Sequence, residues 1–496
     1  MFVKTRSMFG TKSAVIVIAL IAVAVRLIAI NQPFIDRWSW RQSDVAAIAR
    51  NYSENGFHFA RPQIDWAGNA AGYVGTEFPI LPFVAALLYK CFGVHEWIGR
   101  IQGVICFTAA LPFFFLLVRG LFGVTIGIWA TFFYSFAPLS VVASRAFMPD
   151  MPSLSLAIVG LYFYLRWLQR GRASALLTAG LCTSIAVLIK LPTAVIGAPL
   201  LYLTWQRFGW RLWRQPEVWI FAAFALVPPA IWYWHAQEMA ARYYPFHFFG
   251  GGGLRVMDLA WYWKIVRQTV SSSLTPVLFL AAAAGAFLTP RGKYARVFQW
   301  WCATMMLFIV VVGWGNRHQW YQLPLVPIAA VFGGIACRFA TRRLAGYQRA
   351  PLVFSSVVVL LFGGWSLASA RAFYESSAAG LRDLGLELKK ITPRDALIIA
   401  ADDGDPTVFY YAERKGWHFL GDGVYWGNPL DDAQIIANLE KLRGRGARYI
   451  VFYAGTQWWV GYYTQFGEHL KQSSTLLEQT PDFTIYRLNA TPPNSP

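Results

Sequence analysis

Long apolar runs separated by short basic loops fill the first 370 residues of the chain. A membrane-spanning helix needs about 20 predominantly apolar residues, with a range of about 17 to 25. Eleven runs are candidates, some of them short: 13–30, 101–118, 121–144, 151–165, 173–189, 191–206, 218–234, 270–289, 297–315, 320–337 and 351–370. This pattern predicts a polytopic α-helical membrane protein with about 11 transmembrane helices.

A twelfth apolar run, 78–92, is short, contains two prolines and is interrupted by Lys90. If it lies along the membrane interface, all the basic loops fall on the cytoplasmic side, as the positive-inside rule requires. If it spanned the membrane, every later basic cluster would move outside. We therefore predict an interfacial helix and a cytoplasmic N-terminus. The first run begins like a signal peptide, but Arg26 follows it at once, and we favour an uncleaved anchor.

Three segments on the predicted outer side are too long or too polar to be simple connectors. They are the first periplasmic loop 31–100, with its interfacial run, the loop 235–270, and the tail 371–496. The second contains four consecutive glycines, Gly250–Gly253, which maximise backbone freedom. We expect this loop to be flexible and to close over a ligand.

The tail alternates short β-type runs with helical stretches. The β-type runs are 396–401, 448–453 and 483–488, and the helical stretches are 406–415 and 431–445. This alternation predicts a C-terminal soluble α/β domain. The sequence thus suggests a catalytic transmembrane domain at 1–370 and a periplasmic domain at 371–496. Deletion of the tail after Ala370 is then expected to leave a folded membrane domain.

The composition supports a membrane protein. The chain is 56% hydrophobic and only 14% charged, whereas soluble domains are about 25% charged. The net charge of +19 comes from 44 Lys and Arg against 25 Asp and Glu, but the positive charges lie in short loops between apolar runs, so no nucleic-acid partner is indicated. The five cysteines lack metal-ligand spacing, and we expect free thiols.

Ionisable side chains gather at the predicted outer ends of the spans, where they are costly and are therefore functional candidates. They are Asp36, Asp44, Glu77, Arg145, Asp150, Lys190, Arg317 and His318. This mixture suits a reaction between a hydroxyl acceptor and a donor with an anionic leaving group. A carboxylate can take the proton, while cations or a metal ion neutralise the developing phosphate charge.

Each candidate also has a structural interpretation. Asp44 lies near the start of a predicted amphipathic helix, where a carboxylate favours the helix dipole. Asp150 could cap the fourth span, with Arg145 as its salt-bridge partner. His318 fits a hydrogen-bonded interfacial histidine better than a metal ligand. The acidic segment 402–405 reads as a turn between a strand and a helix, which needs no metal.

Four short motifs follow one another in order on the predicted outer side. They are 40–44 (WRQSD) with 48–51 (IARN), 76–79 (TEFP), 144–150 (SRAFMPD) and 318–327 (HQWYQLPLVP). Their order resembles the GT-C glycosyltransferases, particularly family 39, with the protein mannosyltransferases and the aminoarabinose transferases that modify lipid A. The likeness covers about residues 10–340, and the tail resembles the periplasmic domain of bacterial members.

The resemblance implies an enzyme of the bacterial inner membrane that works at the periplasmic face. It would move a hexose or pentose, with inversion, from a polyprenyl-phosphate donor such as undecaprenyl phosphate to a lipid, polysaccharide or protein acceptor. The acid of the first outer loop acts as general base in the family, which points to Asp44. If the chain is aligned with the family on the IARN motif, however, the family's acidic pair falls on Arg41 and Gln42. Asp36 is therefore the second candidate for the general base.

The resemblance also assigns binding roles. Glu77 corresponds to an acid that helps to bind a divalent metal ion in some relatives, and no other cofactor is implied. The lysine that follows this acid in many relatives is Phe78 here. Charge for the lipid phosphate would then come from other residues, and the donor- and acceptor-binding candidates are Glu77, Arg145, Asp150, Lys190, Arg317, His318 and Tyr321.

Three other functions fit parts of the pattern. A lipid-linked sugar flippase or another transporter would also be polytopic, but it would carry acids, prolines and glycines inside matching spans of two halves. A ligase of the O-antigen type would use a pyrophosphate donor with similar chemistry. A non-catalytic scaffold could bind cell-wall material with its tail, but the crowded first outer loop argues against it.

Overall fold

The computed structural model describes residues 2–249, 253–288, 290, 292–421 and 427–489. Gly250–Gly252, in the loop expected to be flexible, lie outside the described residues. The chain forms two compact units. The membrane unit comprises Met1–Ile30, Gly99–Trp234 and Gly250–Phe373, and the loop-tail unit comprises Asn31–Ile98, His235–Phe249 and Tyr374–Pro496. The first loop thus belongs with the tail, which the sequence did not predict.

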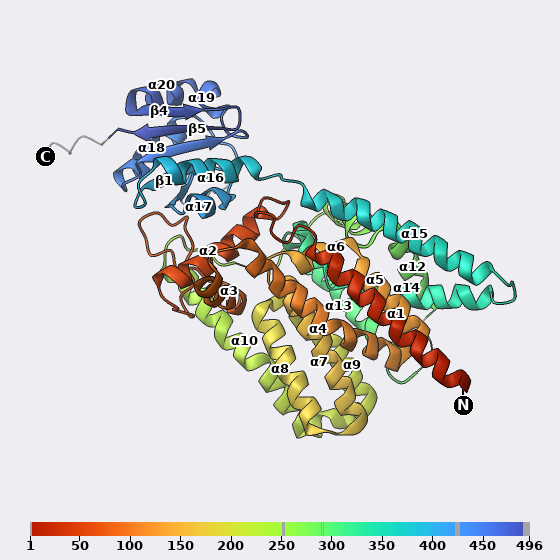
Figure 1. Cartoon of the computed structure of the whole chain (residues 1–496). Helices are drawn as coiled ribbons and strands as arrows, with labels where there is room; N and C mark the ends of the chain where they lie inside the picture. Colours follow the sequence, from red (N-terminus) through yellow and green to blue (C-terminus); the bar gives the residue numbers. More distant parts are fainter. Residues whose placement is uncertain (1, 250–252, 289, 291, 422–426, 490–496) are drawn as a thin grey trace. The chain divides into compact units, whose positions relative to one another are not determined.

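The membrane unit is built mainly from α-helices (Figure 1). They are α1 (Phe2–Leu27), α4 (Glu96–Phe122), α5 (Val124–Phe136), α6 (Pro138–Arg145), α7 (Asp150–Arg170), α8 (Ala173–Ile189), α9 (Gly197–Phe208), α10 (Pro216–Arg242), α11 (Leu259–Gln268), α12 (Pro276–Phe287), α13 (Val297–Val311), α14 (Leu325–Arg343) and α15 (Ala350–Arg371). Each of the eleven predicted spans overlaps one or more of these helices, which confirms the predicted fold class.

Helix length separates the spans into two groups. Among the described residues, five helices are long and apolar enough to cross a membrane, and up to seven if each bent pair is one span. The predicted spans 173–189, 191–206 and 297–315 fall on shorter helices, and the span 13–30 falls on the 26-residue α1. The bent pairs are α5 with α6, at 58°, and α11 to η3 (Thr269–Leu274) with α12, at 105°. Each second helix begins with a proline, which lacks an N–H and disfavours helical backbone in the residue before it.

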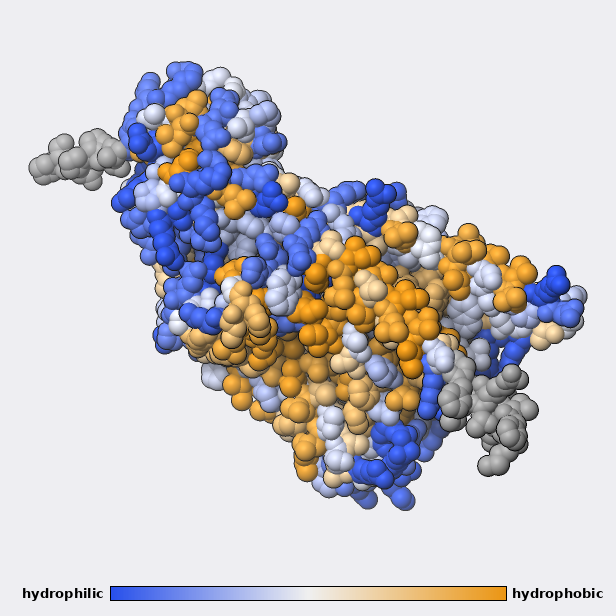
Figure 2. Space-filling view, viewed as in Figure 1, coloured by the Kyte–Doolittle hydropathy of each residue, from blue (hydrophilic) through white to orange (hydrophobic). Residues whose placement is uncertain are grey.

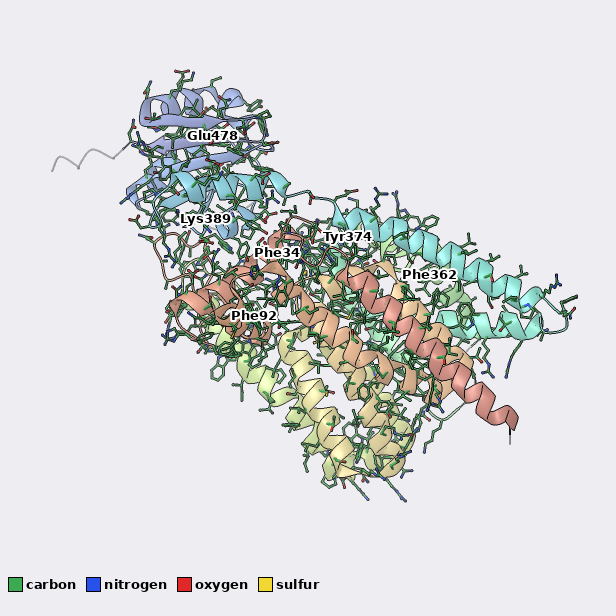
Figure 3. The ribbon with its side chains drawn as sticks, viewed as in Figure 1. Phe34, Phe92, Phe362, Tyr374, Lys389 and Glu478 are labelled. Carbon is green, nitrogen blue, oxygen red and sulfur yellow. The ribbon has the colours of Figure 1, made fainter. Side chains whose placement is uncertain are left out.

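Much of the visible surface of the membrane unit is apolar (Figure 2). Figure 2 shows hydrophobic side chains gathered over its helices, while hydrophilic residues dominate the visible face of the tail. In α15, Leu352, Leu360 and Leu367 are 71%, 73% and 72% exposed. The opposite face of this helix carries Phe362 (Figure 3), which is fully buried with its ring 4.9 Å from that of Phe133. Exposed apolar surface of this extent fits contact with lipid.

A buried arginine ties the first helix to the α5–α6 bend. Arg26 is fully buried, and its guanidinium donates to the carbonyl of Ser135 at 2.9 Å and to the hydroxyl of Ser140 at 3.0 Å. It also lies 3.5 Å from the ring centroid of Phe107. The charge is therefore held by acceptors and by an aromatic face, as a cation away from water requires.

The tail contains a five-stranded sheet of order β2-β1-β3-β5-β4. Strands β2 (Lys415–His418), β1 (Leu397–Ala401) and β3 (Tyr449–Tyr453) are parallel, whereas β5 (Phe483–Leu488) and β4 (Ser474–Gln479) pair antiparallel. Its helices are α16 (Ala379–Ile391), α17 (Thr407–Ala412), α18 (Asp432–Gly444), α19 (Trp459–Tyr462) and α20 (Thr464–Ser473). The three β-type runs predicted from the sequence are β1, β3 and β5, and the α/β prediction is confirmed.

Successive side chains of β1 point to opposite faces of the sheet, so that this strand contributes to two hydrophobic cores. Ile398 and Ala400 face α16 and α17, and Ile399 and Ala401 face α18 and α20. The first core also contains residues of the first loop, which contributes α2 (Ser39–Asn55) and α3 (Ile80–Phe92) to this unit. These first-loop residues are Ile48, Tyr52, Ile64, Trp66, Val74 and Ala86. The loop and the tail therefore share one hydrophobic core, and burial of apolar surface holds them together.

Backbone hydrogen bonds also connect the first loop with the tail. The N–H of Gly68 donates to the carbonyl of Gly416 at 2.6 Å, and the N–H of Gly416 donates to the carbonyl of Asp65 at 3.0 Å. Gly68 has a φ of +61°, and a Cβ there would come within 1.9 Å of the Trp417 ring. Only glycine fits such a close approach in this backbone conformation.

Candidate functional site

Asp44, the predicted general base, lies beyond the first turn of α2 and is 3% exposed. Its carboxylate accepts a hydrogen bond from the indole N–H of Trp66 at 3.0 Å. Burial raises the pKa of the Asp44 carboxyl to about 7, against the lowering effects of Arg41 and the Trp66 hydrogen bond. Helix-dipole effects fade after the first turn, so they do not account for this position. A carboxyl that titrates near neutrality is suited to proton transfer.

Asp36, the second candidate for the base, is engaged at the start of the same helix. One of its oxygens accepts from the backbone N–H of Trp38 at 3.1 Å and from the side-chain amide of Gln42 at 2.7 Å. These contacts fix the turn that leads into α2. They give Asp36 a structural role at the start of the helix, whereas Asp44 accepts its hydrogen bond from Trp66, 22 residues further along the chain.

Glu77 forms a buried ion pair with Arg41. The distance between Arg41 Nη2 and Glu77 Oε2 is 2.7 Å, and both residues are almost fully buried. The hydroxyl of Thr76 donates to the same oxygen at 3.1 Å, and the guanidinium lies 4.6 Å from the ring centroid of Phe249. Within the part of the chain that the structure describes, no group of three or more His, Cys, Asp or Glu side chains is arranged for a metal ion. The residues around Glu77 therefore do not fit the metal site that the resemblance implies.

Two residues of the tail join the cluster around Asp44. His418 Nδ1 lies 2.7 and 2.9 Å from the two carboxylate oxygens of Asp402, and the His418 ring centroid is 5.0 Å from that of Trp66. Burial raises the pKa of Asp402 to about 6, against the lowering effect of His418. The field of His418 also lowers the pKa of Asp44. Sequence reasoning missed His418, although it ends β2 as Asp402 follows β1, and ligand-binding groups gather at the carboxyl ends of parallel strands.

The acidic segment 402–405 forms the turn that was predicted. The Asp402 carboxylate accepts from the N–H of Gly404 at 3.1 Å, and the Asp405 carboxylate accepts from the N–H of Thr407 at 3.0 Å. Such side-chain to backbone bonds are those of Asx turns. Asp405 also accepts from the Ser39 hydroxyl at 2.8 Å, which fastens this turn to the start of α2.

His247 brings a third segment, 235–249, to the same cluster. Its ring centroid is 5.3 Å from that of Trp66 and 4.4 Å from that of Phe249. Burial, together with the positive charge of Arg41, lowers the pKa of His247 to about 4, so this histidine is neutral at pH 7. The first loop, the segment 235–249 and the tail thus build one polar cluster, which we call the Asp44 cluster: Asp44, Arg41, Trp66, Glu77, His247, His418, Asp402 and Asp405.

A second polar group lies in the membrane unit. Asp150 is the first residue of α7, and its carboxylate is 3.5 Å from the ammonium of Lys190, which follows α8. The Lys190 ammonium is also 4.9 Å from the ring centroid of Tyr321. These three residues line a small pocket whose other walls are largely apolar: Leu154, Pro192, Thr193, Met305, Phe308, Trp320, Leu323 and Pro324. The pocket thus combines one buried cation with an acid and an aromatic face.

The other predicted binding residues lie beside this pocket or away from it. Arg145 donates from Nη2 to the carbonyl of Ala29 at 2.6 Å. The guanidinium of Arg317 packs 4.6 Å from the Trp314 ring centroid. His318 stacks on Trp320, with centroids 4.6 Å apart and planes at 3°. The sequence-predicted site residues therefore divide between the units: Asp36, Asp44 and Glu77 in the loop-tail unit, and Arg145, Asp150, Lys190, Arg317, His318 and Tyr321 in the membrane unit.

Part of the chain matches a known protein family. Residues 76–234 match the family described as dolichyl-phosphate-mannose-protein mannosyltransferase. This stretch includes Glu77, Arg145, Asp150 and Lys190. A sequence comparison with curated proteins gives no significant match.

Solved structures share the fold over nearly the whole chain. ArnT from Cupriavidus metallidurans, bound to undecaprenyl phosphate, has a TM-score of 0.67 and 15% identity, covering 95% of this chain and 97% of that one. The oligosaccharyltransferase of Archaeoglobus fulgidus, in complex with zinc and sulfate, has a TM-score of 0.62 and 13% identity over 95% of this chain and 72% of its own. AglB of the same organism, with an inhibitory peptide and a dolichol-phosphate, has a TM-score of 0.63 and 12% identity over 99% and 75%.

These matches identify the class of fold. The chain has the GT-C glycosyltransferase fold of a multi-pass membrane protein, followed by a C-terminal α/β domain, as the resemblance predicted.

Proposed function

We propose that the protein is an inverting glycosyltransferase of the bacterial inner membrane. It transfers a sugar from a polyprenyl-phosphate donor to a lipid, polysaccharide or protein acceptor at the periplasmic face. The observation that carries this proposal is Asp44, a buried carboxyl whose pKa is raised to about 7 by burial and whose oxygen is held by Trp66. The polyprenyl phosphates bound to ArnT and AglB support the class of donor. The basic loops support a cytoplasmic N-terminus and a periplasmic tail.

The proposed reaction is a single displacement. Asp44 takes the proton of an acceptor hydroxyl, and the hydroxyl oxygen forms a bond to the anomeric carbon from the face opposite the phosphate. The bond between the anomeric carbon and the phosphate oxygen breaks, and the polyprenyl phosphate leaves with the electron pair. Because phosphate is already a competent leaving group, charge stabilisation matters more than a general acid.

Access of an acceptor to Asp44 depends on the residues that bury its carboxyl. The carboxyl is almost fully buried, and His247 and Phe249 of the segment 235–249 lie against its neighbours Trp66 and Arg41. We propose that this segment moves to admit the acceptor and then excludes water, since hydrolysis would compete with transfer.

The pH dependence of transfer follows from the role of Asp44. A base acts only when it is deprotonated, so activity should rise with pH through the Asp44 pKa of about 7 and then level. Transfer at pH 6 should be about tenfold slower than at the plateau. Initial rates between pH 5 and 9 with saturating donor measure this profile. A flat profile through this range would remove Asp44 from the role of base.

Lys190 is the proposed ligand of the donor phosphate in the membrane unit. Replacing it with methionine removes the charge but keeps the length of the side chain. Hydrogen bonds to charged groups contribute about 1.5–3 kcal/mol, so kcat/KM for the donor should fall by about 10- to 100-fold. Lys190→Arg should retain more activity than Lys190→Met. Lys389→Met, at an exposed lysine paired with Glu413, is the matched control and should leave kcat/KM unchanged. Equal kcat/KM in the Lys190→Met variant and the wild type would exclude this role.

A further inference from the structure

Arg41 stands where the family resemblance places an acid, and it holds the carboxylate that the resemblance assigns to a metal ion. Its Nη2 is 2.7 Å from Glu77 Oε2, and Thr76 donates to the same oxygen. The pair is buried, with the two side chains only 5% and 6% exposed. We propose that Arg41 is a built-in cation that takes the place of a divalent metal ion at Glu77, so that the Asp44 cluster works without a metal.

The surroundings of Arg41 fit a fixed cation. Its guanidinium packs 4.6 Å from the ring centroid of Phe249, which adds a cation–π contact to the ion pair. An arginine keeps its charge at every physiological pH, and its planar guanidinium matches a carboxylate. A divalent ion at Glu77 would have to compete with this pair, and the described residues offer no group of three ligand side chains.

Arg41 also acts on the proposed base. Residues three apart on a helix lie on the same face, so Arg41 and Asp44 share one face of α2. Among the groups around Asp44, Arg41 makes the largest contribution that favours the charged carboxylate, followed by the Trp66 hydrogen bond and His418, while Asp405 opposes them. Arg41 thus neutralises Glu77 and favours the ionised base, two tasks that a metal ion would otherwise perform. It is a positioning residue, because it acts through Glu77 and Asp44.

Metal content tests the inference without reference to activity. The purified full-length protein is incubated with Zn²⁺ or Mn²⁺, passed through gel filtration, and analysed by elemental mass spectrometry. We expect well below one equivalent of metal per chain. Arg41→Asp restores an acid at this position and frees Glu77, so it should retain more metal than the wild type, and the double variant with Glu77→Gln should lose that gain. One equivalent of metal on the wild type, removed by Glu77→Gln, would overturn the inference.

Kinetics supply the second readout, which rests on the proposed function. Transfer by the wild type should be unchanged in EDTA. Arg41→Gln should slow transfer at pH 7 by at least about tenfold and move the rise in the pH profile to higher pH, because the charge that favours ionised Asp44 is lost. Arg41→Lys should restore the wild-type profile in part. Loss of activity in EDTA that Zn²⁺ or Mn²⁺ restores would contradict the inference, whereas absence of transfer under all conditions would contradict only the proposed function, because metal content is measured independently.

Discussion

Replacement of Asp44 with asparagine should lower the rate of sugar transfer by about 10²- to 10⁴-fold, the usual contribution of a general base. Asparagine keeps the shape of the side chain, and its oxygen can still accept the hydrogen bond from Trp66. Because burial disfavours the ionised carboxyl and raises its pKa to about 7, a neutral side chain should fold at least as well. Initial transfer rates and thermal unfolding in detergent measure the two effects separately.

The matched control for this substitution is Asp36→Asn. It makes the same chemical change in another buried acid of the same segment, and its oxygen can still accept from Trp38 and Gln42. We expect its transfer rate to stay within a few-fold of the wild type. If Asp36→Asn abolishes transfer and Asp44→Asn does not, Asp36 is the base.

Deletion of residues 374–496 should abolish transfer and unfold the first loop. The sequence predicts that the membrane domain stays folded after such a deletion, and the core that the first loop shares with the tail adds that the loop does not. Without the tail, Tyr52, Trp66 and their neighbours would lose their packing partners in α16, α17 and β1. Asp44 would lose its position with them. Limited proteolysis of the truncated protein should cut within 31–98, where the intact protein resists.

A point substitution tests the contact between the first loop and the tail without removing the tail. Arg50 donates to the carboxylate of Asp65 at 2.6 Å, and it lies 4.9 Å from the ring centroid of Tyr410 in α17. Arg50→Ala leaves Asp65 buried without this partner, a change that typically costs about 3–5 kcal/mol. Lys389→Ala breaks an exposed ion pair with Glu413 and should lower the free energy of unfolding by less than about 1 kcal/mol. Lys389 is labelled in Figure 3. Equal stability of the two variants would contradict the shared core.

The sequence predicts much of the fold because hydrophobic patterning is local. The apolar runs become helices, and the alternating runs of the tail become β1, β3 and β5. Strand β2 escaped prediction because Lys415–His418 has only four residues and lacks a run of β-branched side chains. Strand β4 is a largely exposed edge strand, whose position depends on pairing with β5.

The site is less predictable because its contacts are long-range. Asp44 and Glu77 can be selected from the sequence because they are charged residues next to apolar runs. The Trp66 hydrogen bond and the Arg41 ion pair join segments that are 22 and 36 residues apart. His418 reaches the Asp44 cluster only because the tail packs on the first loop. Local pattern carries no signal for such a contact.

The most direct test of the central claim is sugar transfer by the purified protein in liposomes. Radiolabelled sugars are supplied as polyprenyl-phosphate, polyprenyl-pyrophosphate or nucleotide donors, with a membrane extract as acceptor and Asp44→Asn as the inactive control. We predict that label passes to the acceptor from a polyprenyl-phosphate donor alone, with inversion at the anomeric carbon and only with the wild type. Transfer from the pyrophosphate donor alone, or movement of the donor across the bilayer without transfer, would contradict the account.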